Sequence, residues 1–472
     1  MAEVLHWLYD LVHIVAVALV AIGLSQNLLY VLQLLLAAFA LRPDRVRSDY
    51  ATLWNRYSEV CPPISLLAPA YNEEMGIVES VKALLALQYP RIEIVVINDG
   101  SKDRTLELMI EAFSLRATRR AYQTQVQHQP IVGLYESAEY PNLVFVDKLN
   151  GGKADALNAG INVARAPLFC AIDSDSIVEP DALLRLVQPF IDSPARTVAV
   201  GGSVRVVNGC GVSGGRVSRV ATPNGLVPLF QIVEYLRAFL IARVAWSRIQ
   251  TLTLISGAFG LFRRDVSMSV GGYSVDTVGE DLDLVLKIHG RMIEEGRDYD
   301  VVFLPEPLCW TEVPETLGVL KRQRTRWQRG ALEVFFRHRH MLFNPRYGRI
   351  GMLGMGQILL VDVLGPLAEI LGYVLLPVLW AIGGLNVNYL WAFLAMVFLA
   401  GTFFSMASLI LSEAATRRYP EVSDLAKLAL AAFVENFGYR QLNGLWRLRG
   451  WWQFLRKDNR WEAMPRIGFK RD

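Results

Sequence analysis

The chain has 472 residues, of which 53% are hydrophobic, and its mean hydropathy of +0.28 leaves room for a catalytic domain and membrane segments. The net charge of +3 is small and no basic helix or finger motif occurs, so nucleic acid is excluded as an expected partner. The four cysteines stand singly, without metal-ligand spacing, which is typical of reduced core residues in a cytosolic domain: Cys61, Cys170, Cys210 and Cys309.

The first predicted element is a membrane helix. Residues 11–41 contain no Asp, Glu, Lys or Arg, and the run is long enough for one span. Residues 25–27 are polar and would divide it into two pieces too short to cross, so we predict one helix within residues 1–41. A secretory signal is the alternative, because residues 38–40 resemble a cleavage site. However, the start carries Glu3 and Asp10 without Lys or Arg, and the apolar run is too long.

A soluble domain is predicted over residues 42–345. Four apolar strands each break into a polar loop, at "ISLLAPAYNEE", "EIVVINDGSKD", "LVFVDKLNGGKADALNAGI" and "PLFCAIDSDS". Amphipathic helices over residues 79–87 and 154–164 lie between them, so the pattern predicts an α/β fold with a mainly parallel sheet. Ligands bind such sheets at the carboxyl ends of the strands. Residues 113–140 are longer than an ordinary loop and are predicted to be an insertion.

Asp173 and Asp175 directly follow the fourth strand. A plain surface turn is the alternative, since Asp and Ser commonly form turns. Polar loops after four neighbouring strands favour a shared site instead. A short carboxylate pair there suits a hard divalent cation, Mg²⁺ or Mn²⁺, which prefers oxygen ligands and often shares them with phosphate.

A second apolar block follows the soluble domain and predicts a membrane hairpin within residues 346–412, turning near residues 383–386. Asp362 and Glu369 lie in its first helix and should face protein or a polar cavity. Within residues 413–472, residues 425–446 predict an interfacial or re-entrant helix. The tail is expected to pack at the membrane interface through aromatic and basic side chains: Trp451, Trp452, Arg456, Trp461 and Arg466.

Basic residues flank the predicted spans, and the hairpin turn carries no charge. The positive-inside rule therefore predicts a multi-pass protein of the cell membrane with its catalytic domain in the cytoplasm. The basic positions are Arg42, Arg45, Arg47, Arg337, Arg339, Arg346, Arg349, Arg417 and Arg418.

Six motifs occur in one order: "APAYNEE", "VVINDGSKD", "NGGKADALNAGI", "AIDSDS", "GEDLDL" and "QRTRWQRG". Together, over residues 63–330, they resemble the membrane-embedded family 2 glycosyltransferases, which include synthases of cellulose, chitin, hyaluronan and poly-N-acetylglucosamine. The resemblance implies a GT-A fold, a nucleotide-sugar donor and inversion at the anomeric carbon.

The resemblance also assigns roles on the donor side. Tyr71, Glu73 and Asp99 match positions for the uridine, although loop capping is an alternative, above all for Asn72 and Asp103. Lys153 would lie near the diphosphate; as an ordinary helix-start lysine it would oppose the helix dipole. Asp175 is the metal ligand, and Asp173 holds the ribose or assists the metal.

On the acceptor side, Asp281 of "GEDLDL" corresponds to the general base, and Glu280 beside it is expected to raise its pKa. An ordinary helix N-cap is the alternative for Asp281. Gln323, Arg326 and Trp327 match the QxxRW motif that is tied to processive synthesis. Binding of lipid headgroups by this basic helix is its alternative. Residues 256–265 resemble the acceptor-side strand.

These roles predict a processive synthase that polymerises a UDP-sugar, UDP-N-acetylglucosamine first, into a β-linked polysaccharide and passes it into or across the membrane. The nearest alternative is transfer of one sugar to a membrane lipid. A catalytically silent membrane scaffold is a third reading, disfavoured because a scaffold has no physical need for this set of residues. The expected partners are the donor, a growing glycan or lipid acceptor and membrane lipids, and partner subunits stay open.

Overall fold

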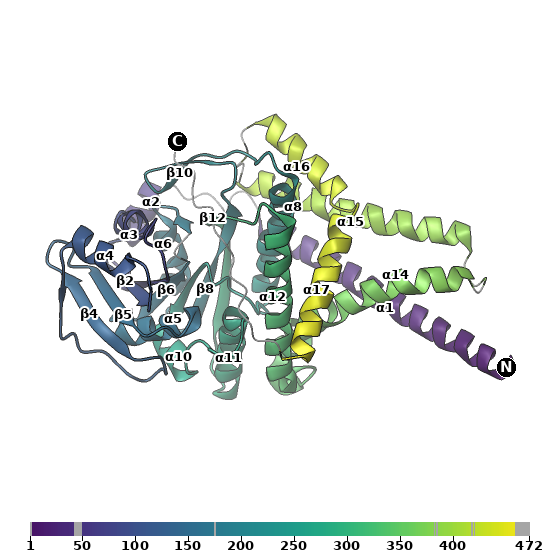
Figure 1. Cartoon of the computed structure of the whole chain (residues 1–472), viewed down its shortest axis with the longest axis horizontal. Coiled ribbons are helices and arrows are strands. Elements are labelled where there is room, and N and C mark those ends of the chain that lie inside the picture. The colour runs from purple at the N-terminus through teal and green to yellow at the C-terminus, as the bar shows by residue number, and fades with distance from the viewer. Residues whose placement is uncertain are drawn as a thin grey trace.

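The computed structural model describes residues 2–41, 50–173, 176–381, 383, 386–416, 419 and 421–457. Figure 1 shows a sheet with its helices at one end of the molecule and the long helices α1, α14 and α15 extending from the other. The helices α12 (Leu317–Arg337) and α17 (Tyr439–Leu455) lie side by side between these two parts.

The predicted parallel strands are confirmed as the centre of a ten-stranded sheet. They are β1 (Ile64–Ala70), β2 (Ile92–Asp99), β5 (Leu143–Lys148) and β6 (Leu168–Ile172), in the order β5-β2-β1-β6 and all parallel. They are nearly continuous buried apolar runs, as parallel strands covered on both faces require. Their carboxyl ends therefore meet at one edge of the sheet.

Further strands, some of them antiparallel, extend this centre on both sides. The predicted insertion contains β3 (Leu115–Ala117) and β4 (Ile131–Ser137), which pair antiparallel and continue the sheet beyond β5. On the other side, β11 (Phe259–Arg263) runs antiparallel between β6 and β8 (Thr197–Val206), followed by β12 (Asp300–Thr311) and β7 (Ile177–Val178). β9 (Gly211–Ser213) and β10 (Arg216–Arg219) form a separate small sheet.

Helices follow the strands of the sheet and pack on it. The two predicted amphipathic helices are α3 (Ile77–Leu85) and α5 (Lys153–Val163), shifted by one or two residues. The others in this part are α2 (Tyr50–Tyr57), α4 (Thr105–Phe113), α6 (Ala182–Leu186), α7 (Gln188–Asp192), α10 (Arg264–Ser269) and α11 (Glu280–Glu294). A longer unpredicted helical segment runs through α8 (Leu226–Tyr235), a π-helical stretch Leu236–Ala242 and α9 (Arg243–Arg248).

Among the described residues, three helices are long and apolar enough to cross a membrane: Val12–Ala40 within α1 (Ala2–Ala40), Ile350–Ala381, and Leu390–Thr416 within α15 (Val387–Thr416). The second is helical throughout, through Ile350–Gly354, α13 (Met355–Gln357), Ile358–Leu364 and α14 (Gly365–Ala381). These helices agree with the predicted single helix and hairpin. Asp362 and Glu369 both line an internal cavity, as expected, and Asp362 pairs with Arg447 at 3.2 Å.

The prediction of one helix over residues 425–446 was wrong. The chain forms α16 (Val422–Val434) and α17 instead, and Gly438 begins α17 with a φ of 91°, a conformation that favours glycine. α17 packs closely on α12: a Cβ at Gly450 would lie 2.7 Å from the carbonyl oxygen of Thr325. Trp461 and Arg466 of the tail lie outside the described residues.

Candidate active site

One cavity of about 3220 Å³ joins the strand ends to the membrane helices. A pocket for one small ligand usually measures roughly 300–1,000 Å³, so this cavity has room for a donor and an extended acceptor together. Every described residue that the sequence nominated lines it: Tyr71, Glu73, Asp99, Lys153, Asp173, Glu280, Asp281, Gln323, Arg326 and Trp327. Asp175, the nominated metal ligand, lies outside the described residues.

The loop after β1 is held in place by the loop after β2. The backbone amide of Glu74 donates to Asp103 at 3.0 Å, and that of Lys102 donates to the Asn72 side chain at 2.8 Å. The capping role suspected for Asn72 and Asp103 is therefore observed. It leaves Tyr71, 46% exposed, with its ring available at the cavity wall, where a nucleoside base could stack.

Asp99 is nearly buried, with 3% of its surface exposed, and its carboxylate is already engaged within the protein. It accepts hydrogen bonds from Lys148 Nζ at 2.6 Å and from the backbone amides of Gly151 and Gly152 at 3.0 and 2.7 Å. Lys148 also pairs with Asp155 at 2.6 Å. The contacts show Asp99 shaping the glycine loop before α5, whereas its contact with a nucleotide base stays a prediction.

Lys153, Asp173 and Asp281 are connected around Gly257. Lys153 forms an ion pair with Asp173, and its Nζ donates to the Gly257 carbonyl oxygen at 3.3 Å. The amide of Gly257 donates to Asp281 Oδ2 at 3.1 Å. Burial alone would lower the pKa of Lys153. The nearby carboxylates of Asp173 and Glu280 outweigh this effect and raise the pKa above its ordinary value, so the ammonium stays charged. Residues from the start of α5, the end of β6, the segment before β11 and the start of α11 thus meet.

Glu280 and Asp281 lie in the first turn of α11, and the N-cap residue is Gly279. The N-cap alternative for Asp281 is therefore not observed. Two glycines bring this turn to α12, because a Cβ at Gly330 would lie 2.9 Å from the Gly279 nitrogen. The close approach joins "GEDLDL" to "QRTRWQRG" and places Asp281 and Trp327 on one cavity. Trp327 is 39% exposed, so its ring is accessible for stacking.

The stability of the chain is expected to depend on pH through Glu280. Burial, and secondarily Asp281, raise its pKa to about 7, from the ordinary 4.5. The folded chain thus retains a proton that the unfolded chain releases, and stability falls as pH rises from about 4.5 to 7. Glu280→Gln should therefore melt a few degrees above the native chain at about pH 8 and close to it at about pH 5.

Thermal unfolding in detergent at both values measures this difference. Glu295→Gln, at the exposed end of the same helix, is the matched control and should melt like the native chain at both. An equal shift of Glu280→Gln at both pH values would contradict the assignment.

A divalent cation fits the donor side of the cavity. In the described part of the chain, which omits Asp175, no cluster of three or more His, Cys, Asp or Glu side chains is suited to a metal. Mg²⁺ and similar ions are commonly held by one or two carboxylates together with substrate phosphates, so such a cluster is not required. Asp173 offers a carboxylate at the cavity wall beside Lys153.

Sequence reasoning missed four contributors to this region. Lys148 stands at the end of a strand, and Asp155 lies within the motif "NGGKADALNAGI" but was given no role. Glu234 and Arg324 form an ion pair at 2.6 Å between α8 and α12. The one available signal was charge in apolar surroundings: Lys148 ends the run "LVFVDK", and Glu234 interrupts "LFQIVEYL".

Comparisons with known proteins match the motif-bearing region. A sequence model described as Glycosyl transferase family 2 matches residues 65–270. A second, described as Glycosyl transferase family group 2, matches residues 168–406, slightly more than half of the chain.

Curated relatives match a little more than half of the chain. Poly-beta-1,6-N-acetyl-D-glucosamine synthase of Staphylococcus epidermidis is 30% identical over 275 residues, which are 58% of this chain and 56% of that protein. The protein of that name from Staphylococcus aureus (strain COL) is 33% identical over 279 residues, with the same two shares. The chain spans about half the length of these relatives.

Among solved structures, mannosyltransferase PcManGT from Pyrobaculum calidifontis, in complex with GDP-Man and Mn²⁺, is similar with a TM-score of 0.56 at 19% identity. The similarity covers 95% of this chain and 100% of that one. At this identity the likeness shows the fold alone.

Proposed function

Because the chain belongs to family 2 of the glycosyltransferases and has the GT-A fold, we propose that it polymerises a sugar from a nucleotide donor into a β-linked polysaccharide. The observation that carries the proposal is the single cavity, which runs from Lys153 and Asp173 past Asp281 and Trp327 to the membrane helices. UDP-N-acetylglucosamine is the proposed donor. It is supported by the names of the curated relatives, which are 30% and 33% identical to this chain over 275 and 279 residues.

The proposed reaction is one displacement at the anomeric carbon. The Asp281 carboxylate takes the proton of the acceptor hydroxyl, and the oxygen attacks as the nucleotide leaves. Lys153 places positive charge where the leaving diphosphate gains negative charge. Asp173 and Asp175 would hold Mg²⁺ or Mn²⁺, which supplies further charge neutralisation when bound; PcManGT is described in complex with Mn²⁺.

The membrane end of the cavity supports an extended glycan as its occupant. Its wall carries side chains that can hydrogen-bond to hydroxyl groups, from α1, α14, α15 and α17: Gln26, Asn27, Tyr30, Gln33, Glu369, Tyr373, Ser408, Gln441 and Asn443. Polar side chains within membrane segments commonly mark the path of a polar substrate. We propose that the product leaves along this wall and that the catalytic domain lies on the cytoplasmic side.

Transfer of one sugar to a membrane lipid is the second candidate. It is favoured by a specific feature, the small number of candidate spans in the described chain, which leaves little enclosure for a polymer. In that case the same catalytic groups would act once for each acceptor.

A donor panel separates the two candidates. The full chain in nanodiscs receives radiolabelled UDP-N-acetylglucosamine, UDP-glucose, UDP-glucuronate or GDP-mannose, with Mg²⁺, Mn²⁺ or EDTA, and nucleotide release and product size are recorded. A long product from UDP-N-acetylglucosamine, lost in EDTA, is expected. A lipid that carries a single sugar would refute polymerisation and support the second candidate. Absence of transfer from every donor would overturn both candidates.

A further inference from the structure

A buried carboxylate on α8 holds a side chain of α12 next to the acceptor candidates. Glu234 Oε2 accepts hydrogen bonds from Arg324 at 2.6 Å and from the Tyr439 hydroxyl at 3.0 Å, while its Oε1 accepts from Asn443 at 3.2 Å. The side chains of Arg324 and Glu234 are only 12% and 13% exposed. Glu234, itself held by Tyr439 and Asn443 of α17, therefore fixes the Arg324 guanidinium.

Arg324 in turn covers Trp327. Its guanidinium carbon lies over the indole, 4.6 Å from the ring centroid, and the two residues are three positions apart on α12. The Arg324 Nε is buried and makes no hydrogen bond with the described residues, so this part of the guanidinium is not engaged by a competing polar partner. A planar guanidinium stacks on an aromatic face in a way that an ammonium cannot reproduce.

An indole has two faces, and the covered face is closed to a sugar ring. Trp327 nonetheless retains 39% exposure and lines the cavity. A pyranose stacks on an aromatic ring through its own apolar face. The acceptor sugar can therefore meet only the uncovered face of Trp327.

Building on the proposed function, we propose that Glu234 and Arg324 are positioning residues that hold Trp327 so that one ring face receives the acceptor sugar. Arg324 occupies the first variable position of the QxxRW motif, and Glu234 lies outside the motif. Their action on the acceptor passes through the indole, and Tyr439 and Asn443 of α17 extend the control to the C-terminal helix.

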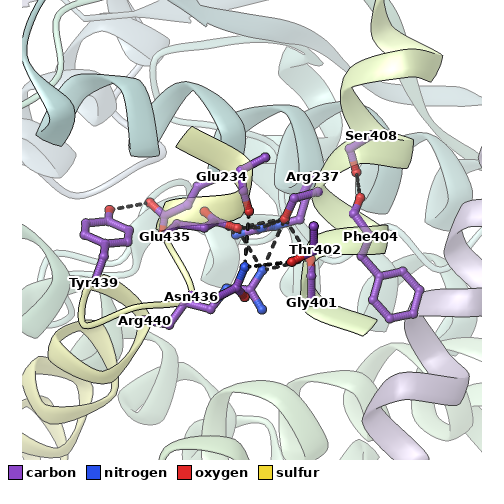
Figure 2. Close-up of polar contacts among 12 residues, drawn as sticks. Glu234, Arg237, Gly401, Thr402, Phe404, Ser408, Glu435, Asn436, Tyr439 and Arg440 are labelled. Carbon is purple, nitrogen blue, oxygen red and sulfur yellow. Dashed lines mark hydrogen bonds and ion pairs between the residues drawn. The ribbon is translucent and has the colours of Figure 1, made fainter. Parts of the chain in front are cut away.

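A second cluster of hydrogen bonds holds α17 in place. Figure 2 shows Glu234 and Tyr439 beside a second cluster, in which Glu435 accepts hydrogen bonds from Arg237, from Arg440 at 2.8 Å and from Ser405 at 2.7 Å. Glu435 is fully buried. This cluster ties the α8 segment, α15 and α17 together, so α17 is held next to Glu234 from both the soluble and the membrane part.

The test compares Glu234→Gln and Arg324→Lys with the native chain in nanodiscs, using UDP-N-acetylglucosamine and a soluble N-acetylglucosamine oligosaccharide as acceptor. Both variants should raise the KM for the oligosaccharide by about fivefold, the scale of one cation–π contact, and leave the KM for the donor unchanged. In a Trp327→Ala background, Glu234→Gln should add nothing, because its effect passes through the indole.

Glu421→Gln, which removes one carboxylate from the exposed Arg219–Glu421 pair, is the matched control and should behave as the native chain. If Glu234→Gln alone merely unfolds, Arg324→Lys still tests the stacking. Equal increases of both KM values, or an undiminished effect of Glu234→Gln without Trp327, would overturn the proposal. A native chain that transfers no sugar to any glycan would instead refute the proposed function.

Discussion

Asp281→Asn is expected to lower kcat by about 10²–10⁴-fold, the usual contribution of a general base, while the chain still folds and binds the nucleotide sugar. The asparagine retains an oxygen that can accept from the Gly257 amide, as Asp281 Oδ2 does at 3.1 Å. It loses the ability to take a proton, the negative charge and the second acceptor oxygen, which accepts from the Leu282 amide at 2.9 Å in the native chain. The first turn of α11 and its contact with α12 depend on Gly279 and Gly330, which this change leaves in place.

The measurement is nucleotide release and product formation at saturating donor, with donor affinity from competition by UDP. Asp192→Asn, at the exposed end of α7 and outside the cavity, is the matched control and should keep native activity. If Asp281→Asn retained activity within about threefold, Asp281 would not be the base, and Glu280 would be the next candidate, since its raised pKa suits proton transfer near neutral pH.

The central fold was predictable from the sequence because its signals are local. A parallel strand covered on both faces must be an apolar run, and "ISLLAPA", "IEIVVIND", "LVFVDK" and "LFCAI" are such runs, each followed by a polar loop. The three long membrane-compatible helices were equally visible as long apolar stretches with few charged residues. In both cases the apolar character extends over nearly the whole element.

The α8 segment was missed for a different reason. Leu226–Tyr235 is nearly as apolar as a strand, and its polar members, such as Glu234, find partners on α12 and α17, far away in the sequence. Likewise, the break between α16 and α17 depends on one glycine, Gly438, within a sequence that is otherwise compatible with a continuous helix. Tertiary partners decide such positions, and a single sequence does not reveal them.

The candidate site was predictable by residue type, but not by contact. Motifs nominated Lys153, Asp173, Asp281 and Trp327, and the structure places all four on one cavity. The same reasoning assigned Asp99 to the nucleotide, which stays a prediction, but did not reveal that its carboxylate accepts from Lys148 and two backbone amides. Such contacts are a property of three-dimensional neighbours and cannot be read from a motif.

The contacts of Asp99 lead to the largest stability effect we expect, from Lys148→Met. Lys148 is 1% exposed and its ammonium pairs with both Asp99 and Asp155 at 2.6 Å. Removal of the cation leaves two buried carboxylates without their shared partner. Breaking a buried ion pair in this way commonly costs about 3–5 kcal/mol, so the variant should melt roughly ten degrees lower.

Activity should fall together with stability, because Asp99 also accepts from the amides of Gly151 and Gly152, and Gly152 has a φ of 88°. If the carboxylate shifts, the loop that begins α5 loses its support and Lys153 loses its place beside Asp173. Thermal unfolding and donor KM are the two measurements. Lys82→Met is the matched control: Lys82 and Glu79 form a largely exposed pair, and such pairs contribute little.

A second variant separates charge from packing. In Lys148→Met/Asp155→Asn, one of the two uncompensated charges is removed while an oxygen remains to accept from the Gln129 amide, so part of the lost melting temperature should return. If the double variant melts no higher than Lys148→Met, Lys148 acts through its packing alone. If Lys148→Met melts like Lys82→Met, the Asp99–Lys148–Asp155 cluster does not hold the glycine loop. Lys153 would then be held in place by Gly257 and Asp173 alone.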